Sequence, residues 1–121
     1  MSPSRRALLI VEDNDETRHV LERILSVKGH DTKSTEDAEE ALRVLRAGYR
    51  PAVIILDLYL PGMDGAGFLR ELQADAALAT IPVVAFTAHR GEPPPGLTAF
   101  VRKGSDDPDV LLNAIAACLT A

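Results

Sequence analysis

The feature of this sequence that most constrains its fold is an unbroken apolar run from Ala52 to Leu56. Successive side chains of a β-strand point to opposite faces of the sheet, so a run without polar alternation indicates a strand covered on both faces. Strands of this kind belong to parallel sheets that carry helices on each side. Asp57 follows the run directly, at the edge where open α/β sheets bind ligands. We therefore predict that Asp57 is a functional residue.

A second apolar run, from Ala7 to Val11, ends in the same way, because Glu12 and Asp13 follow it immediately. Acidic side chains also suit the start of a helix, so helix capping is the alternative role for these two residues. Two predicted strands thus end in carboxylates.

The rest of the chain alternates between predicted strands and helices. The expected strands are residues 7–11, 30–34, 52–56, 82–87 and 97–102. Apolar residues at helical spacing predict helices after the first three strands and after the last. Candidate caps are residues 13–15 for the first helix, Ser34 or Thr35 for the second and residues 105–107 before Pro108 for the last. Because right-handed crossovers place a helix between successive strands, this order predicts a doubly wound, five-stranded parallel α/β sheet.

The segment between Thr87 and Leu97 does not follow this alternation, because it contains Pro93, Pro94 and Pro95 in succession. Proline lacks an amide donor and pushes the residue before it out of the helical region. We expect the helix after the fourth strand to be lost or vestigial.

Length, charge and cysteine content limit the functional classes. A chain of 121 residues fits one domain, here 1–121 with a core of about 6–119, and leaves no room for an output domain. A net charge of −5 argues against direct nucleic-acid binding, which needs a basic surface. The first apolar run is too short for a signal peptide or a membrane span. Cys118 is alone and is expected to be a small buried hydrophobic residue, which favours a reducing, cytoplasmic setting.

Five polar residues are expected to converge at the carboxyl ends of the strands, namely Glu12, Asp13, Asp57, Thr87 and Lys103. Three adjacent carboxylates repel one another unless a cation neutralises them, and an open, all-oxygen site suits Mg²⁺. A hydroxyl and an ammonium opposite the metal provide donors for the oxygens of a phosphoryl group. Asp57 is then a candidate nucleophile that forms an aspartyl phosphate.

Four motifs in this order resemble those of the receiver domains of two-component response regulators. They are Val11–Asn14, Ile54–Gly65, Pro82–Ala88 and Phe100–Lys103. The resemblance covers almost the whole chain and implies a flavodoxin-like (βα)5 fold with strand order 2-1-3-4-5. It also implies a signalling module, rather than an enzyme, that assists only its own phosphorylation and dephosphorylation.

The same resemblance implies how the site works. Asp57 would receive a phosphoryl group from a histidine kinase or a histidine phosphotransfer protein. Asp13, Asp57 and the main-chain carbonyl of Tyr59 would bind Mg²⁺ directly, while Glu12 would support the metal through water. The switch would be propagated by Thr87, Lys103 and Phe100 to a downstream protein that the sequence does not identify.

Two alternatives remain open in the sequence. Gly104 stands where the family usually has a proline, and together with the missing helix it is the evidence for a degenerate receiver that binds proteins without being phosphorylated. The intact set of three acids, Glu12, Asp13 and Asp57, argues against this alternative. A hydrolase with an aspartyl-phosphate intermediate ranks last, because Tyr59 occupies the position where such enzymes carry a second acid. For His89 an exposed loop position is favoured over contact with the phosphoryl group.

Overall fold

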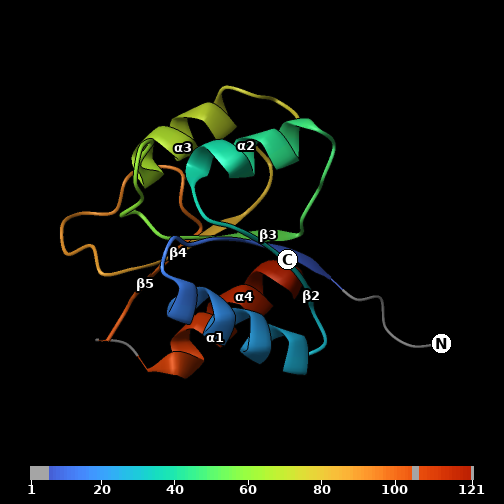
Figure 1. The fold of residues 1–121 in the computed structure, drawn as a ribbon, viewed down its shortest axis with the longest axis vertical. Helices are drawn as coiled ribbons and strands as arrows, with labels where there is room; N and C mark the ends of the chain where they lie inside the picture. The colour runs from blue at the N-terminus through green and yellow to red at the C-terminus, as the bar shows by residue number, and fades with distance from the viewer. Residues whose placement is uncertain (1–5, 105–106, 121) are drawn as a thin grey trace.

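A computed structural model describes residues 6–104 and 107–120 of the chain. The elements of this part are β1 (Ala7–Val11), α1 (Asp15–Val27), β2 (Asp31–Thr35), α2 (Ala38–Arg46), β3 (Val53–Leu56), α3 (Gly65–Gln73), β4 (Val83–Thr87), β5 (Ala99–Arg102) and α4 (Pro108–Thr120) (Figure 1). All five predicted strands form. β5 begins at Ala99 instead of Leu97, and the other strands start or end within one residue of the expected positions.

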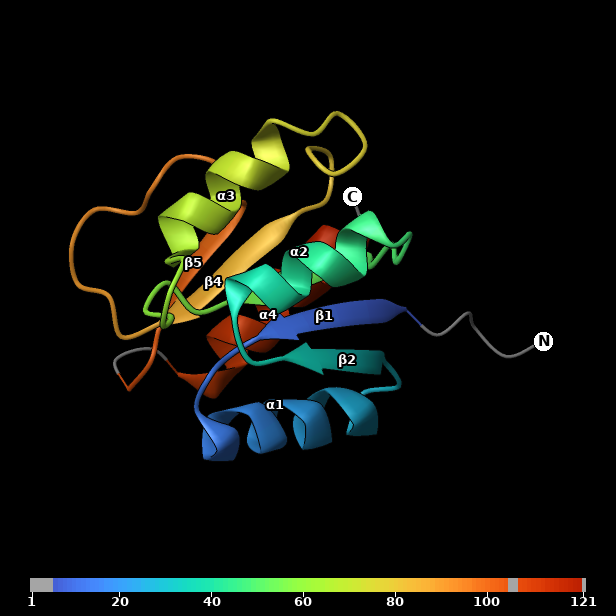
Figure 2. The same ribbon diagram turned by 45° about the horizontal axis from the view of Figure 1, so that its top comes forward.

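The strands form one parallel sheet in the order β2-β1-β3-β4-β5. Helices α1 and α4 cover one face of this sheet and α2 and α3 cover the other (Figures 1 and 2). The doubly wound fold and its strand order are thereby confirmed. β2, the short polar strand, lies at an edge of the sheet that the described residues form.

The two-sided cover explains the apolar runs. In β1, Leu8 and Ile10 face α1 and α4, whereas Leu9 and Val11 face α2 and α3, and all four side chains are fully buried. The residues of β3 alternate in the same way. A strand buried on both faces has no position for a polar side chain until it ends, which is why Asp57 marks the end of β3.

The start of α2 differs from the prediction, since neither Ser34 nor Thr35 caps this helix. Thr35 is the last residue of β2, and its hydroxyl donates a hydrogen bond to the carbonyl of Ile10 in β1 over 3.1 Å. The cap is Asp37, whose carboxylate accepts a hydrogen bond from the Glu40 amide over 2.7 Å. Pairing along the sheet extends β2 past the predicted cap and moves the start of the helix.

The other helix starts agree with the sequence where the structure describes them. Asn14 caps α1 by accepting a hydrogen bond from the Thr17 amide, and Pro108 is the first residue of α4. Of the candidate caps for α4, residues 105 and 106 lie outside the described residues. Across the described part, no helix is both long and apolar enough to span a bilayer.

The chain from 88 to 98 runs from β4 to β5 as an irregular loop without a helix, as the three prolines predict. Figure 2 shows this loop extending away from the sheet and returning behind α3. One smaller expectation needs correction, because Cys118 is only half-buried.

Candidate phosphoryl-accepting site

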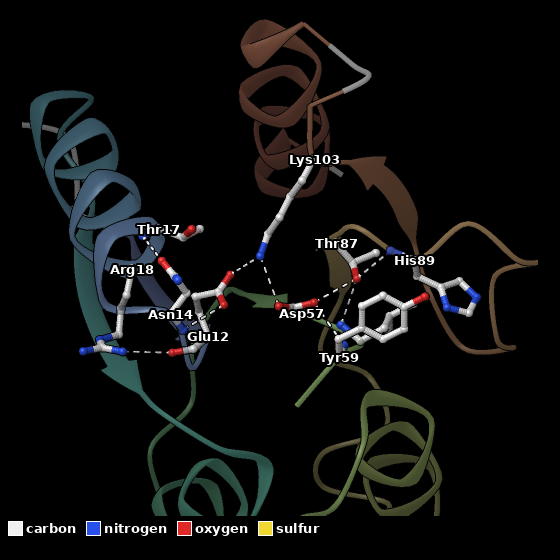
Figure 3. Close-up of polar contacts among 10 residues, drawn as sticks. Glu12, Asn14, Thr17, Arg18, Asp57, Tyr59, Thr87, His89 and Lys103 are labelled. Atoms are coloured by element: carbon white, nitrogen blue, oxygen red, sulfur yellow. Dashed lines mark hydrogen bonds and ion pairs between the residues drawn. The ribbon is translucent and has the colours of Figure 1, made fainter. Parts of the chain in front are cut away.

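The predicted site residues meet at the carboxyl edge of the sheet. Glu12 follows β1, Asp57 follows β3, Thr87 ends β4 and Lys103 follows β5 directly. Their side chains point toward one another from these strand ends (Figure 3). Asp13 comes next to Glu12 and also lies close to Asp57. The fold therefore brings together all five polar residues that the sequence singles out.

The Asp57 carboxylate is 6% exposed and has a hydrogen-bond donor for each oxygen. Oδ1 accepts hydrogen bonds from the Thr87 hydroxyl over 2.8 Å and from the Tyr59 amide over 3.0 Å. Oδ2 lies 3.1 Å from Nζ of Lys103. These contacts fix the orientation of the carboxylate at the end of β3.

Glu12 is only 2% exposed and shares Lys103 with Asp57. Its Oε1 lies 2.6 Å from Nζ of Lys103, and its Oε2 accepts a hydrogen bond from the Asn14 amide. Burial raises the pKa of Glu12, although the hydrogen bonds from Lys103 and Asn14 act in the opposite direction. Burial alone would lower the pKa of Lys103, but the hydrogen bond to Glu12 and the charge of Asp57 outweigh it and raise that pKa. Lys103 is therefore an ammonium at neutral pH.

Glu12, Asp13 and Asp57 form the acid cluster. One oxygen from each of the three carboxylates lies within 4.8 Å of the other two. Glu12 and Asp57 are buried, whereas Asp13 is exposed and leaves the cluster open to water. A set of carboxylate oxygens beside solvent fits Mg²⁺, a hard cation that prefers oxygen ligands and keeps several waters.

Thr87 connects the site to two neighbouring segments. Its side chain is fully buried, and its hydroxyl donates to Asp57 while accepting hydrogen bonds from the amides of Leu58 and His89 over 3.3 and 3.2 Å. A change in the position of the Thr87 hydroxyl would therefore alter both the connection after β3 and the loop after β4.

His89 is half-buried, which corrects the expected exposed position. Its ring lies edge-on between two aromatic rings, with its centroid 5.5 Å from that of Tyr59 and 6.2 Å from that of Phe100. Phe100 is half-buried and packs against the core on the α2 and α3 side of the sheet. A hollow of about 520 Å³ lies beside Tyr59 and His89 and includes Leu60 and Pro94 in its lining. The loop that replaces a helix thus contributes His89 to the surroundings of Phe100.

Two glycines shape the chain around the site. A Cβ atom at Gly65 would lie 2.7 Å from Cα of Leu58, so only glycine lets α3 begin this close to the residue after Asp57. Gly104 has a φ of +76°, a conformation that the proline ring excludes. Lys103 nevertheless reaches both Glu12 and Asp57 with glycine after it.

Arg18 is a residue of the site that the sequence reasoning missed. It is 9% exposed, and its Nη1 donates a hydrogen bond to the main-chain carbonyl of Glu12 over 3.1 Å. A signal for it exists in the sequence, because positions 18, 21 and 25 lie on one face of a helix and the other two carry Leu21 and Leu25. A cation at an apolar position of a buried helix face indicates a specific partner.

Comparison with known proteins agrees with this geometry. The sequence profile of the response regulator receiver domain matches residues 8–115. The DNA-binding response regulator MtrA of Mycolicibacterium smegmatis is 36% identical over 88 residues, which are 73% of this chain and 37% of that protein. The chain spans about a third of the length of the curated relatives it matches first.

Solved structures show the same fold. The signal receiver domain of a histidine kinase from Syntrophus aciditrophicus is 31% identical, has a TM-score of 0.83 and covers 95% of this chain and 90% of its own. A response regulator from Chloroflexus aurantiacus is 25% identical, has a TM-score of 0.86 and covers 98% of this chain and 100% of its own. The chain belongs to the response regulator receiver domain family.

Proposed function

We propose that this chain is a signalling module that accepts a phosphoryl group on Asp57 from the phosphohistidine of a histidine kinase or a histidine phosphotransfer protein. The observation that carries this proposal is the environment of the Asp57 carboxylate. It is buried at the carboxyl edge of the sheet, hydrogen-bonded by Thr87 and Lys103, and adjacent to the carboxylates of Glu12 and Asp13.

The proposed transfer replaces one bond to phosphorus by another. A carboxylate oxygen of Asp57 attacks the phosphorus and forms a P–O bond, while the P–N bond of the donor phosphohistidine breaks. The bonding electron pair leaves with the imidazole, which then takes up a proton from solvent. Hydrolysis later returns Asp57 to the carboxylate and releases inorganic phosphate.

The acid cluster and the main-chain carbonyl of Tyr59 would hold Mg²⁺, which when bound would neutralise charge on the transferring phosphoryl group. Lys103 stands beside Asp57 as a second positive charge, and Thr87 supplies a hydroxyl donor on the other oxygen of the same carboxylate. Both side chains would turn from the carboxylate toward the phosphoryl oxygens once Asp57 is phosphorylated. This exchange of partners is the proposed switch.

The switch would spread through the contacts of Thr87. Its hydroxyl accepts a hydrogen bond from the His89 amide, and the His89 ring lies against the ring of Phe100. Movement of Thr87 would therefore shift the loop after β4 and alter the surroundings of Phe100. No helix between β4 and β5 is needed for this effect. We place the response in this loop and in the segment around Lys103, where a downstream protein would detect it.

The receiver domain would comprise residues 1–121, with a core of about 6–119, and would act in the cytoplasm. The relative MtrA is named as a DNA-binding protein. The net negative charge of this chain argues against direct contact with nucleic acid here. The proposed partners are therefore proteins: the phosphodonor and an effector that distinguishes the phosphorylated form.

The test is incubation with acetyl phosphate and Mg²⁺, followed by intact mass spectrometry. We expect the wild-type chain to gain one phosphoryl group, and Asp57→Asn or excess chelator to prevent the gain. Asp109→Asn, at an exposed acid on α4, serves as the matched control and should leave it unchanged. A folded wild-type chain that never gains the group would contradict the proposal and support the degenerate receiver.

A further inference from the structure

Arg18 is a buried cation on the face of α1 that packs against the sheet. It is 9% exposed and shares this face with Leu21 and Leu25, which are 3% and 1% exposed. Burying a charged group is costly unless the group is paired and hydrogen-bonded. The position of Arg18 therefore depends on its partners, and the partners in turn are held by Arg18.

These partners come from three segments of the chain. Nη1 donates to the carbonyl oxygen of Glu12, at the end of β1, over 3.1 Å. Nη2 donates to the carboxylate of Asp15, in the first turn of α1. The same Nη2 lies 3.7 Å from Oε1 of Glu36, in the connection between β2 and α2. The planar guanidinium, with several N–H groups in a fixed arrangement, suits such a multiple contact better than an ammonium does.

Glu12 is consequently held from two sides (Figure 3). Arg18 binds its main-chain carbonyl, while Lys103 binds its carboxylate over 2.6 Å. The carbonyl of Glu12 belongs to the peptide plane that continues to the amide and Cα of Asp13. A contact that fixes this carbonyl therefore restricts the orientation of the peptide that joins the two acidic residues.

We infer that Arg18 is a positioning residue of the metal site. By fixing the peptide plane between Glu12 and Asp13, it holds both carboxylates close enough to Asp57 for one divalent cation to bridge the acid cluster. The inference rests on the proposed function, in which this cluster binds Mg²⁺. Arg18 contacts neither the metal nor the phosphoryl group and acts through the main chain of Glu12.

A purely structural role would have a different signature. If Arg18 only anchors α1 on the sheet, its removal lowers the free energy of unfolding and leaves the metal affinity of the folded chain unchanged. If it positions the carboxylates, the affinity of the folded chain for Mg²⁺ falls as well. Loss of groups that orient metal ligands typically weakens metal binding by about 10- to 100-fold.

The experiment measures the Mg²⁺ dissociation constant of Arg18→Met and Arg18→Lys by NMR titration of backbone amide shifts, after urea unfolding has shown that each variant is folded. We expect Arg18→Met to raise the constant about tenfold and Arg18→Lys to raise it less. Arg23→Met, at an exposed position of the same helix, is the matched control and should bind like the wild type. Saturating Mg²⁺ should restore most of the phosphorylation rate of Arg18→Met with acetyl phosphate.

A double variant, Asp15→Asn with Glu36→Gln, keeps Arg18 but removes both of its carboxylate partners, and it serves if Arg18→Met does not fold. It should weaken Mg²⁺ binding by a smaller factor than Arg18→Met. If Arg18→Met folds and binds Mg²⁺ with the wild-type dissociation constant, the inference is overturned and the proposed function stays intact. If Arg18→Met does not fold, a wild-type constant in the double variant has the same meaning. A wild-type chain that binds no Mg²⁺ would overturn both.

Discussion

Lys103 Nζ lies 2.6 Å from Oε1 of Glu12, although 91 residues separate the two in the sequence. The same ammonium lies 3.1 Å from Oδ2 of Asp57, so one cation stands between two buried carboxylates. Like charges at this distance destabilise a fold unless an opposite charge is near. Lys103 therefore compensates part of the repulsion within the acid cluster from inside the protein.

The first prediction concerns this compensation. Lys103→Met should lower the free energy of unfolding by about 2 kcal/mol in the presence of chelator, because it removes one partner of a partly buried ion pair. Added Mg²⁺ should stabilise the variant more than the wild type, since it supplies the missing positive charge. Urea unfolding with chelator and with Mg²⁺ measures both effects. Lys28→Met, at an exposed position, is the control. Equal stabilisation of variant and wild type by Mg²⁺ would contradict the account.

The second prediction concerns the response to phosphorylation. Beryllium fluoride, a phosphoryl mimic, should change amide hydrogen exchange in residues 88–98 and around Lys103, because the Thr87 hydroxyl binds both Asp57 and the His89 amide. Thr87→Val should reduce the change in the loop, whereas Thr87→Ser keeps the hydroxyl and should preserve it. Exchange that changes only in α1 or α2 would refute this route.

The third prediction tests the start of α2. Asp37→Ala should cost about 1 kcal/mol of stability, because it removes the side chain that caps the helix. Asp37→Asn should cost much less, since asparagine is an equally good cap. Thermal and urea unfolding of the two variants provide the comparison. Similar losses in both would show that the charge of Asp37, and not its capping hydrogen bond, stabilises the helix.

The fourth prediction concerns Cys118 on α4. Burial raises the pKa of its thiol, so less of the reactive thiolate is present at a given pH. Alkylation by iodoacetamide near neutral pH should be several-fold slower in the folded chain than in the chain unfolded by urea. Comparable rates in the two states would mean that the thiol is more accessible than its position on α4 indicates.

Local sequence patterns determine the sheet and the loop after β4, whereas contacts between distant segments determine other features of the fold and the site. The apolar runs that end just before Glu12 and Asp57 predict the parallel sheet, because a strand that is buried on both faces carries apolar side chains throughout. Lys103 lies near these acids because parallel strands bring their carboxyl ends to the same edge of the sheet, where its long side chain reaches both carboxylates. The prolines from 93 to 95 exclude a helix for reasons that do not depend on the rest of the fold.

The features that escaped prediction depend on contacts between distant segments. Thr35 carries a good capping side chain, but pairing of β2 with β1 uses its hydroxyl elsewhere. His89 is partly covered because Tyr59 and Phe100 approach it from other parts of the chain. Arg18 has an unusual position on its helix face, but only the folded chain shows that the Glu12 carbonyl lies within its reach.

Reduction of the phosphorylated chain with borohydride, which converts an aspartyl phosphate to homoserine, identifies the residue that carries the phosphoryl group when it is followed by peptide mass spectrometry. After incubation with Mg²⁺ and a phosphodonor, we expect homoserine at position 57 and at no other aspartate. Homoserine at Asp13 or at another aspartate would contradict this assignment. So would a folded, phosphorylated chain without homoserine at position 57.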